Sequence, residues 1–115
     1  MKPAVVVVLC TAPANGEKGR LGAKALAQKV VDEGLCACVN VVPGVTSFFR
    51  WQGRVDRAEE LLLVAKTTAV AAARLRQRIA ELHPYDVPEV IELSVADGLP
   101  GYLQWVADSV GPSPS

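Results

Sequence analysis

Two cysteines, two positions apart, have the spacing that most directly predicts chemistry. Cys36 and Cys38 lie in a stretch predicted as a strand, so both thiols are expected on the same face. Two sulfur ligands on one face suit a soft ion such as Cu(I). The alternative is packing against a helix, as free cysteine commonly does, and this is the expectation for Cys10. A tetrahedral zinc site is not expected, because the chain has no C-x-x-C pair.

The single histidine is the second candidate ligand. His83 can coordinate a metal ion as neutral imidazole, or carry a proton near neutral pH. Glu89 follows it on the next predicted strand and is expected to lie near it. The predicted metal ligands are therefore Cys38 and His83, with Glu89 or Cys36 as a further ligand. His83 can instead bond the free carbonyl groups at the end of a helix.

A lysine predicts a second kind of site, for a small anion. Lys66 closes an apolar run and precedes Thr67, which is an N-cap candidate together with the threonine after it. An ammonium group beside free backbone N–H groups suits a carboxylate or phosphate. With Tyr85, these residues predict a ligand cleft. Alternatively, Lys66 extends into solvent or pairs with Glu60 or Glu89.

Three of the six aromatic residues are expected to anchor an interface or the core. They are Trp51 at a predicted hairpin turn, and Tyr102 and Trp105 on the last predicted helix. Stacking on a base or ring is the alternative. Twelve basic residues balance twelve acidic ones, so the chain lacks the basic excess that phosphate backbones require, and no nucleic-acid partner is expected.

Catalysis is not predicted. The chain has no glycine-rich phosphate loop, nucleophile elbow or paired-acid motif. An acid–base role for His83 and Tyr85 is an alternative, but no nucleophile with an obvious partner base accompanies them.

Seven elements must position these residues. Hydrophobic periodicity and turn residues predict strands over 5–10, 35–51, 59–66 and 88–95, with a bulge at Pro43-Gly44 and a hairpin turn over 51–54. They also predict a helix over 23–31, a second that follows Thr67 and ends at His83, and a third over 102–110.

This order predicts an α+β fold of the ferredoxin-like, split βαβ kind, with an extra C-terminal helix. Two right-handed crossovers place both long helices on one face of a four-stranded antiparallel sheet. The strands over 5–10 and 59–66 are expected to be central neighbours. The loops after Cys10 and after Lys66 are then expected to open on the same edge of the sheet.

Length and composition predict one domain over 1–110, followed by a frayed tail over 111–115. No apolar run reaches about 18 residues, so no membrane span is expected. Three cysteines without a signal-peptide pattern predict reduced thiols in the cytoplasm.

One face of the predicted sheet has no helix to cover it. Residues 5–8 and 61–64 are nevertheless apolar at every position. Another copy of the chain is the simplest cover, so self-association is expected.

A series of short motifs runs through nearly the whole chain: Cys38-Val39-Asn40, Trp51-x-Gly53, Lys66-Thr67, His83-Pro84-Tyr85 before Pro88-Glu89, and Tyr102-Leu103-x-Trp105. In this order they resemble the CutA divalent-cation tolerance family. Two positions depart from its pattern. Phe49 stands where the family often has an aromatic residue with a hydroxyl, and Cys36 stands where alanine is more usual.

The resemblance implies a ferredoxin-like subunit in a compact homotrimer, with the long hairpin strands pairing between subunits. It also implies a response to metal ions, with binding of copper or other divalent metals, and a trimer shape like that of the PII signalling proteins. An alternative function is a PII-like signalling or scaffold trimer that binds a small anionic ligand in inter-subunit clefts near Lys66, Tyr85 and Glu89.

Overall fold

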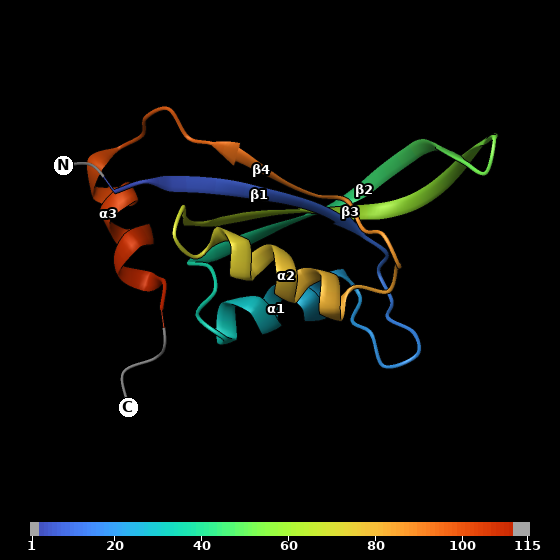
Figure 1. Cartoon of the computed structure of the whole chain (residues 1–115), viewed down its shortest axis with the longest axis horizontal. Helices are drawn as coiled ribbons and strands as arrows, with labels where there is room; N and C mark the ends of the chain where they lie inside the picture. The colour runs from blue at the N-terminus through green and yellow to red at the C-terminus, as the bar shows by residue number, and fades with distance from the viewer. Residues whose placement is uncertain (1–2, 112–115) are drawn as a thin grey trace.

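The computed structural model describes residues 3–111, so the predicted tail lies outside the described residues except for Gly111. The strands and helices follow one another along the chain in the predicted order (Figure 1). Their bounds are β1 Val5–Ala12, α1 Ala23–Asp32, β2 Cys38–Trp51, β3 Arg54–Thr68, α2 Ala72–Leu82, β4 Val90–Ser94 and α3 Pro100–Ser109.

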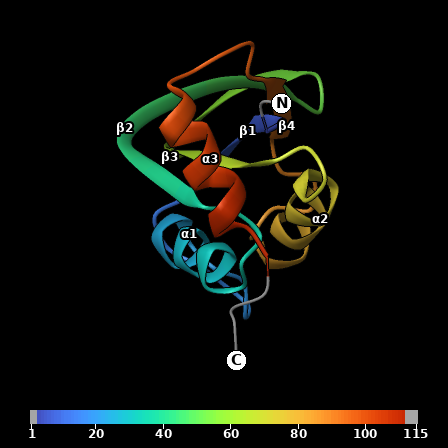
Figure 2. The ribbon, with the colours of Figure 1, turned by 90° about the vertical axis from the view of Figure 1, so that its left-hand side faces the viewer.

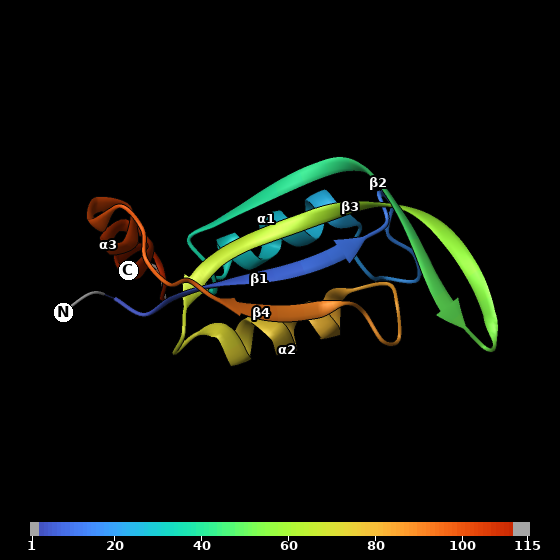
Figure 3. The same ribbon diagram turned by 90° about the horizontal axis from the view of Figure 1, so that it is seen from above.

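The four strands form one antiparallel sheet in the order β2-β3-β1-β4. Helices α1 and α2 lie side by side under one face (Figure 1), while the other face carries no helix and is seen from above in Figure 3. Helix α3 packs at one end of the sheet (Figure 2). The predicted α+β, split βαβ architecture is confirmed, with β1 and β3 as central neighbours.

The predicted position of two loops is wrong. Val5 of β1 pairs with Thr68 of β3, and Ala12 pairs with Leu61. The end of β1 therefore lies beside the middle of β3, and the loops after Cys10 and after Lys66 are at opposite ends of the sheet. The reason is the hairpin, which reverses the chain once between β1 and β3 and makes them antiparallel.

In the β2–β3 hairpin, β3 is longer than the predicted 59–66, whereas β2 begins three residues later than predicted. The hairpin projects beyond the helices (Figure 1). Its turn has Gln52 at φ 50° and Gly53 at φ 78°, and positive φ at both central residues is the type I′ signature. The predicted bulge is confirmed, because the β2–β3 register shifts between Val42 and Val45. Trp51, beside the turn, is exposed.

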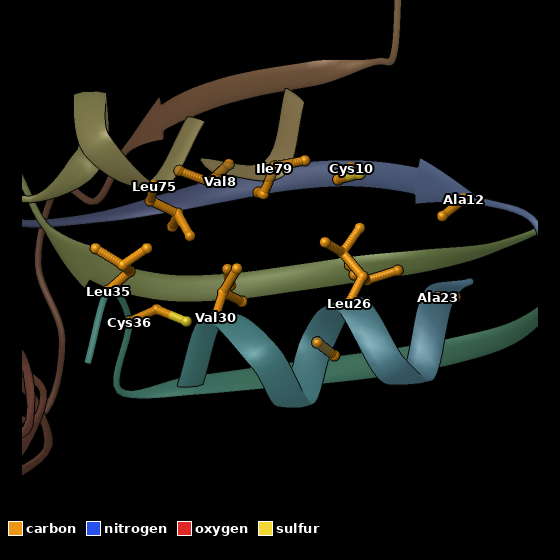
Figure 4. Close-up of a cluster of buried hydrophobic side chains, with 13 residues drawn as sticks. Val8, Cys10, Ala12, Ala23, Leu26, Val30, Leu35, Cys36, Leu75 and Ile79 are labelled. Carbon is orange, nitrogen blue, oxygen red and sulfur yellow. The ribbon is translucent and has the colours of Figure 1, made fainter. Parts of the chain in front are cut away.

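The main core lies between the sheet and the two long helices (Figure 4). Leu26 of α1 and Leu75 of α2 are fully buried against Val8 and its neighbours on β1. The helical spacing of the apolar residues puts them on one stripe of each helix, and that stripe faces the sheet. Both helices consequently depend on the sheet for their stability.

A smaller apolar cluster attaches α3. Leu103 and Val106 pack on Val5, at the start of β1. Past the end of α3, the Gly111 N–H donates to the Gly34 carbonyl over 2.8 Å. Gly34 lies just past the end of α1, with φ 72°. These contacts join α3 to the end of α1.

A Gly34→Ala variant is expected to lose about 2–3 kcal/mol of stability, the sum of left-handed backbone strain and the loss of one hydrogen bond. A Cβ at this position would lie 2.0 Å from the Gly111 carbonyl oxygen, so that segment must move away. Urea unfolding and amide exchange at Gly111 measure the effect. Gly53→Ala is the matched control: Gly53 has φ 78° but no atom within 4 Å of the added Cβ, so it reports backbone strain alone. Equal losses in the two variants would contradict the predicted clash.

Candidate functional site

The predicted pairing of Cys36 and Cys38 on one strand face is wrong. Strand β2 begins only at Cys38, so strand alternation does not extend back to Cys36. Cys36 is buried in the main core beside Val30 and Leu35 (Figure 4). Burial raises the pKa of its thiol to about 12, with a smaller contribution from Cys38. Cys36 therefore matches the alternative expectation of a packed cysteine.

Cys38 lies on the helix-free face of the sheet. The next residue, Val39, packs against the main core, so Cys38 points the other way. Its cross-strand partner is Lys66. The Lys66 ammonium donates to Cys38 Sγ over 3.8 Å and to the Asn40 side-chain carbonyl oxygen. Lys66 therefore does not pair with Glu60 or Glu89, the partners that the sequence offered as an alternative.

Helix α3 brings a pair of aromatic side chains close to Cys38. The pKa of the Tyr102 hydroxyl is raised, first by its partial burial and then by the charge and hydrogen bond of Cys38. The Tyr102 and Trp105 rings are in contact, with centroids 5.6 Å apart. Both rings keep exposed surface in the single chain. We call Cys38, Asn40, Lys66 and Tyr102 the Cys38 cluster.

The predicted helix N-terminus beside Lys66 is wrong. Strand β3 continues to Thr68, and α2 begins at Ala72 with Ala71 as its N-cap. Thr67 is fully buried and donates to the Leu35 carbonyl over 2.7 Å, so its hydroxyl holds the chain ahead of β2. The longer strand is the physical reason: Lys66 has strand neighbours rather than the free N–H groups of a helix.

His83 is fully buried where α2 ends, and both ring nitrogens are engaged. Nε2 lies 2.7 Å from the Thr11 carbonyl oxygen, and Nδ1 accepts the Tyr85 N–H over 3.0 Å. The pKa of His83 is lowered, mainly because burial disfavours the imidazolium. The imidazole therefore holds the end of β1 and not the last carbonyls of α2.

Tyr85 links His83 to a buried carboxylate. Its hydroxyl donates to Glu60 Oε2 over 2.8 Å, and its ring centroid is 4.7 Å from that of His83. Glu60 is only 6% exposed. Burial and the Glu60 hydrogen bond raise the pKa of Tyr85 to about 12. We call Thr11, Glu60, His83 and Tyr85 the His83 cluster.

The two clusters lie far apart in one chain. Glu60 and Lys66 are six residues apart on β3, a separation of about 20 Å along a strand. Neither Cys38 with His83 nor Lys66 with Tyr85 is therefore brought together within one subunit. Within residues 3–111, no group of three or more histidine, cysteine, aspartate or glutamate side chains could hold a metal ion.

Glu89, the remaining predicted ligand, belongs to the His83 end of the molecule. It is exposed just before β4. Burial raises the pKa of the Cys10 thiol to about 12, and the charges of Glu89 and Glu60 add to this shift. Both carboxylates therefore lie near the end of β1, and neither is close to Lys66.

The sequence interpretation missed the role of Asn40, although a signal for it was present. The hairpin turn pairs Trp51 with Arg54, and counting back through the one bulge places Cys38 opposite Lys66. Asn40 is two residues further along the same strand face. The two residues that hold the Lys66 ammonium thus follow from the turn and the bulge.

Known proteins resemble this chain in both sequence and fold. A model of the family described as CutA1 divalent ion tolerance protein matches residues 6–109. The divalent-cation tolerance protein CutA of Thermus thermophilus is 50% identical over 105 residues, which cover 91% of this chain and 97% of that protein. The chloroplastic CutA protein of Arabidopsis thaliana is 42% identical over 90% of this chain, which spans only 54% of that longer protein.

A solved structure of a CutA protein has the same fold as this chain. The PII-like protein CutA from Nostoc superposes with a TM-score of 0.82 at 31% identity, over 93% of this chain and 98% of that one. No helix among residues 3–111 is long and apolar enough to cross a membrane. With the split βαβ fold and the ordered motifs, these likenesses show that the chain belongs to the CutA1 divalent ion tolerance protein family.

Proposed function

We propose that the chain works as a homotrimer in which copies cover the helix-free face of the sheet. The observation that carries the proposal is the exposure of large apolar side chains on that face. Ile91 and Leu93 pair with Leu9 and Val7 on the side opposite the main core, and both are nearly half exposed in the single chain. A formal net charge of zero offers little repulsion between copies.

We further propose that the trimer takes part in the response to metal ions, with Cys38 as the sulfur ligand of a copper ion or another divalent metal. Cys38 is the cysteine that is not fully buried, and it lies on the face where copies are expected to meet. Cys36 and His83 are enclosed in one subunit, the latter with both nitrogens bonded. A second copy would supply the remaining donors, Glu89 among them.

A specific observation favours a second candidate function, a PII-like role with a small anionic ligand. The Lys66 ammonium is 3.8 Å from Cys38 Sγ, and a positive charge this close repels a metal ion and attracts a carboxylate or phosphate. The Nostoc protein is itself described as PII-like. In this case Lys66 and Asn40 bind the anion and Cys38 lines its site.

One pair of titrations separates the two functions. Cys38→Ser is expected to weaken Cu(I) binding at least tenfold in anaerobic competition titrations, because it removes the soft ligand. Lys66→Leu is expected to retain or improve Cu(I) binding, since it removes the repelling charge without adding a sulfur ligand. Cys36→Ala is the matched control and is expected to bind like the parent chain. Unchanged Cu(I) affinity in Cys38→Ser contradicts the metal proposal.

The same variants test the anion. Binding of inorganic phosphate, citrate or ATP to the parent chain, retained in Cys38→Ser and lost in Lys66→Leu, supports the PII-like function. If Lys66→Leu binds these anions as well as the parent chain does, the second proposal is wrong.

We infer a binding protein rather than an enzyme, acting in the cytoplasm. The imidazole of His83 is sealed from solvent, so His83 and Tyr85 do not form an acid–base pair that a substrate can reach. All three cysteines are free thiols, the state that a reducing compartment maintains.

A further inference from the structure

The partners of His83 determine its protonation state. The Thr11 carbonyl only accepts hydrogen bonds, so the nitrogen facing it, Nε2, carries the hydrogen. The Tyr85 N–H only donates, so Nδ1 must present its lone pair. The described arrangement is therefore possible only for neutral imidazole with the proton on Nε2.

Protonation destroys one of these two contacts. A proton added to Nδ1 faces the Tyr85 N–H, so two donors meet at a fully buried ring. The new cation also lies near the buried Glu60 carboxylate, which already accepts from the Tyr85 hydroxyl. An imidazolium gains more from that carboxylate than from the backbone of Tyr85. Tyr85 therefore loses its hydrogen bond to His83 and its hydrogen bond to Glu60 in the same event.

We propose that His83, Tyr85 and Glu60 form a proton-sensitive switch: neutral His83 holds Tyr85 on Glu60, and protonated His83 replaces Tyr85 and releases its segment. Glu60 belongs to the strand that continues into the projecting hairpin, and Tyr85 to the connection between α2 and β4. The switch thus joins two parts of the chain that are far apart in sequence. It depends on contacts within one subunit and stands whether or not the proposed trimer or ligand is correct.

The surroundings of His83 fix the direction of the pH effect. The ionisable groups around it and Tyr85 are Glu60 on β3, Cys10 on β1, Glu17 and Arg20 in the β1–α1 loop, and Glu89 before β4. Arg20 donates to the His83 carbonyl over 3.0 Å and so ties the loop to the same turn. Burial lowers the pKa of His83 below its ordinary 6.5, and the hydrogen bond to Thr11 and the charge of Glu60 oppose this shift only in part.

The stability of the fold is therefore expected to decrease on acidification. The unfolded chain binds a proton at His83 more readily than the folded chain, so the contribution is fully present above about pH 6.5 and is lost as the pH falls below it. The switch therefore operates below about pH 6.5.

The experiment is an NMR titration of the full chain between pH 8 and 4.5. The chain has one histidine, so the 13C-labelled ring signal is unambiguous. We expect the His83 ring and the Tyr85 amide to shift with a common midpoint below pH 6.5, while far-UV circular dichroism stays constant. Tyr102, the other tyrosine, lies in the Cys38 cluster and is expected not to change.

Two variants complete the test. In His83→Gln the side-chain amide still donates to Thr11 but does not titrate, so the Tyr85 amide is expected to remain constant. In Tyr85→Phe the loss of the hydroxyl leaves Glu60 free to stabilise the cation, so the His83 midpoint is expected to rise. The proposal is overturned if Tyr85 titrates equally in His83→Gln or if His83 titrates without Tyr85. It is also overturned if the Tyr85→Phe midpoint does not rise, or if His83 remains neutral until the chain unfolds.

Discussion

An Ile91→Asp, Leu93→Asp double variant is expected to be a monomer under conditions in which the parent chain is a trimer. Both residues lie on the helix-free face at the β4 edge of the sheet, where they are 48% and 46% exposed in the single chain. If a second copy covers them, two carboxylates on each subunit become buried without partners. Burial of an unpaired charge costs several kcal/mol even after relaxation, so the two carboxylates strongly disfavour assembly through this face.

Size-exclusion chromatography with light scattering measures the outcome. Val31→Asp is the matched control, because Val31 is comparably exposed at 38% but lies on α1, on the opposite side of the sheet. That variant is expected to keep the mass of the parent assembly. A parent chain that is itself monomeric, or a double variant of unchanged mass, contradicts assembly through the helix-free face.

A Leu75→Ala variant is expected to lose about 3–4 kcal/mol of stability, because a fully buried leucine leaves a cavity that its neighbours fill only in part. Leu75 lies on the buried stripe of α2 and packs in the main core with Leu35 and Val8 (Figure 4). The free energy of unfolding of a domain this size is about 5–15 kcal/mol, so the expected loss is a large fraction of the total stability.

Urea unfolding at fixed protein concentration measures this loss, since assembly makes apparent stability depend on concentration. Val70→Ala is the control: Val70 is 93% exposed in the turn before α2, and its truncation is expected to change stability by less than about 0.5 kcal/mol. Similar losses of stability in the two variants would mean that burial of Leu75 does not hold α2 against the sheet.

The hairpin is the part of the fold that local sequence determines most directly. The turn at 51–54 and the bulge at Pro43-Gly44 were predicted from glycine and proline, because few residues adopt the backbone conformations these features require. Helix α1 was predicted from an apolar period that only a helix satisfies. Local chemistry suffices for such features, because each is decided by neighbours in the sequence.

The site residues show the opposite case. Cys36 and Cys38 are two positions apart, yet one lies in the core and the other on the helix-free face, because β2 starts between them. Where a strand starts depends on its partner strand, and no residue near Cys36 marks that point. The N-cap expected beside Lys66 failed for the same reason, since pairing with β1 extends β3 through Thr68.

The amino-acid sequence alone thus determined the family, the order of the elements and an apolar face that needs a cover. These follow from residue types and periods, which a linear chain displays directly. The tertiary structure decided which groups meet: Lys66 with Cys38 and Asn40, and His83 with Tyr85 and Glu60, in two clusters about 20 Å apart along β3. The physical reason is that strand register and strand direction are set by pairing between distant segments, and these two choices place each side chain at one end of the sheet or the other.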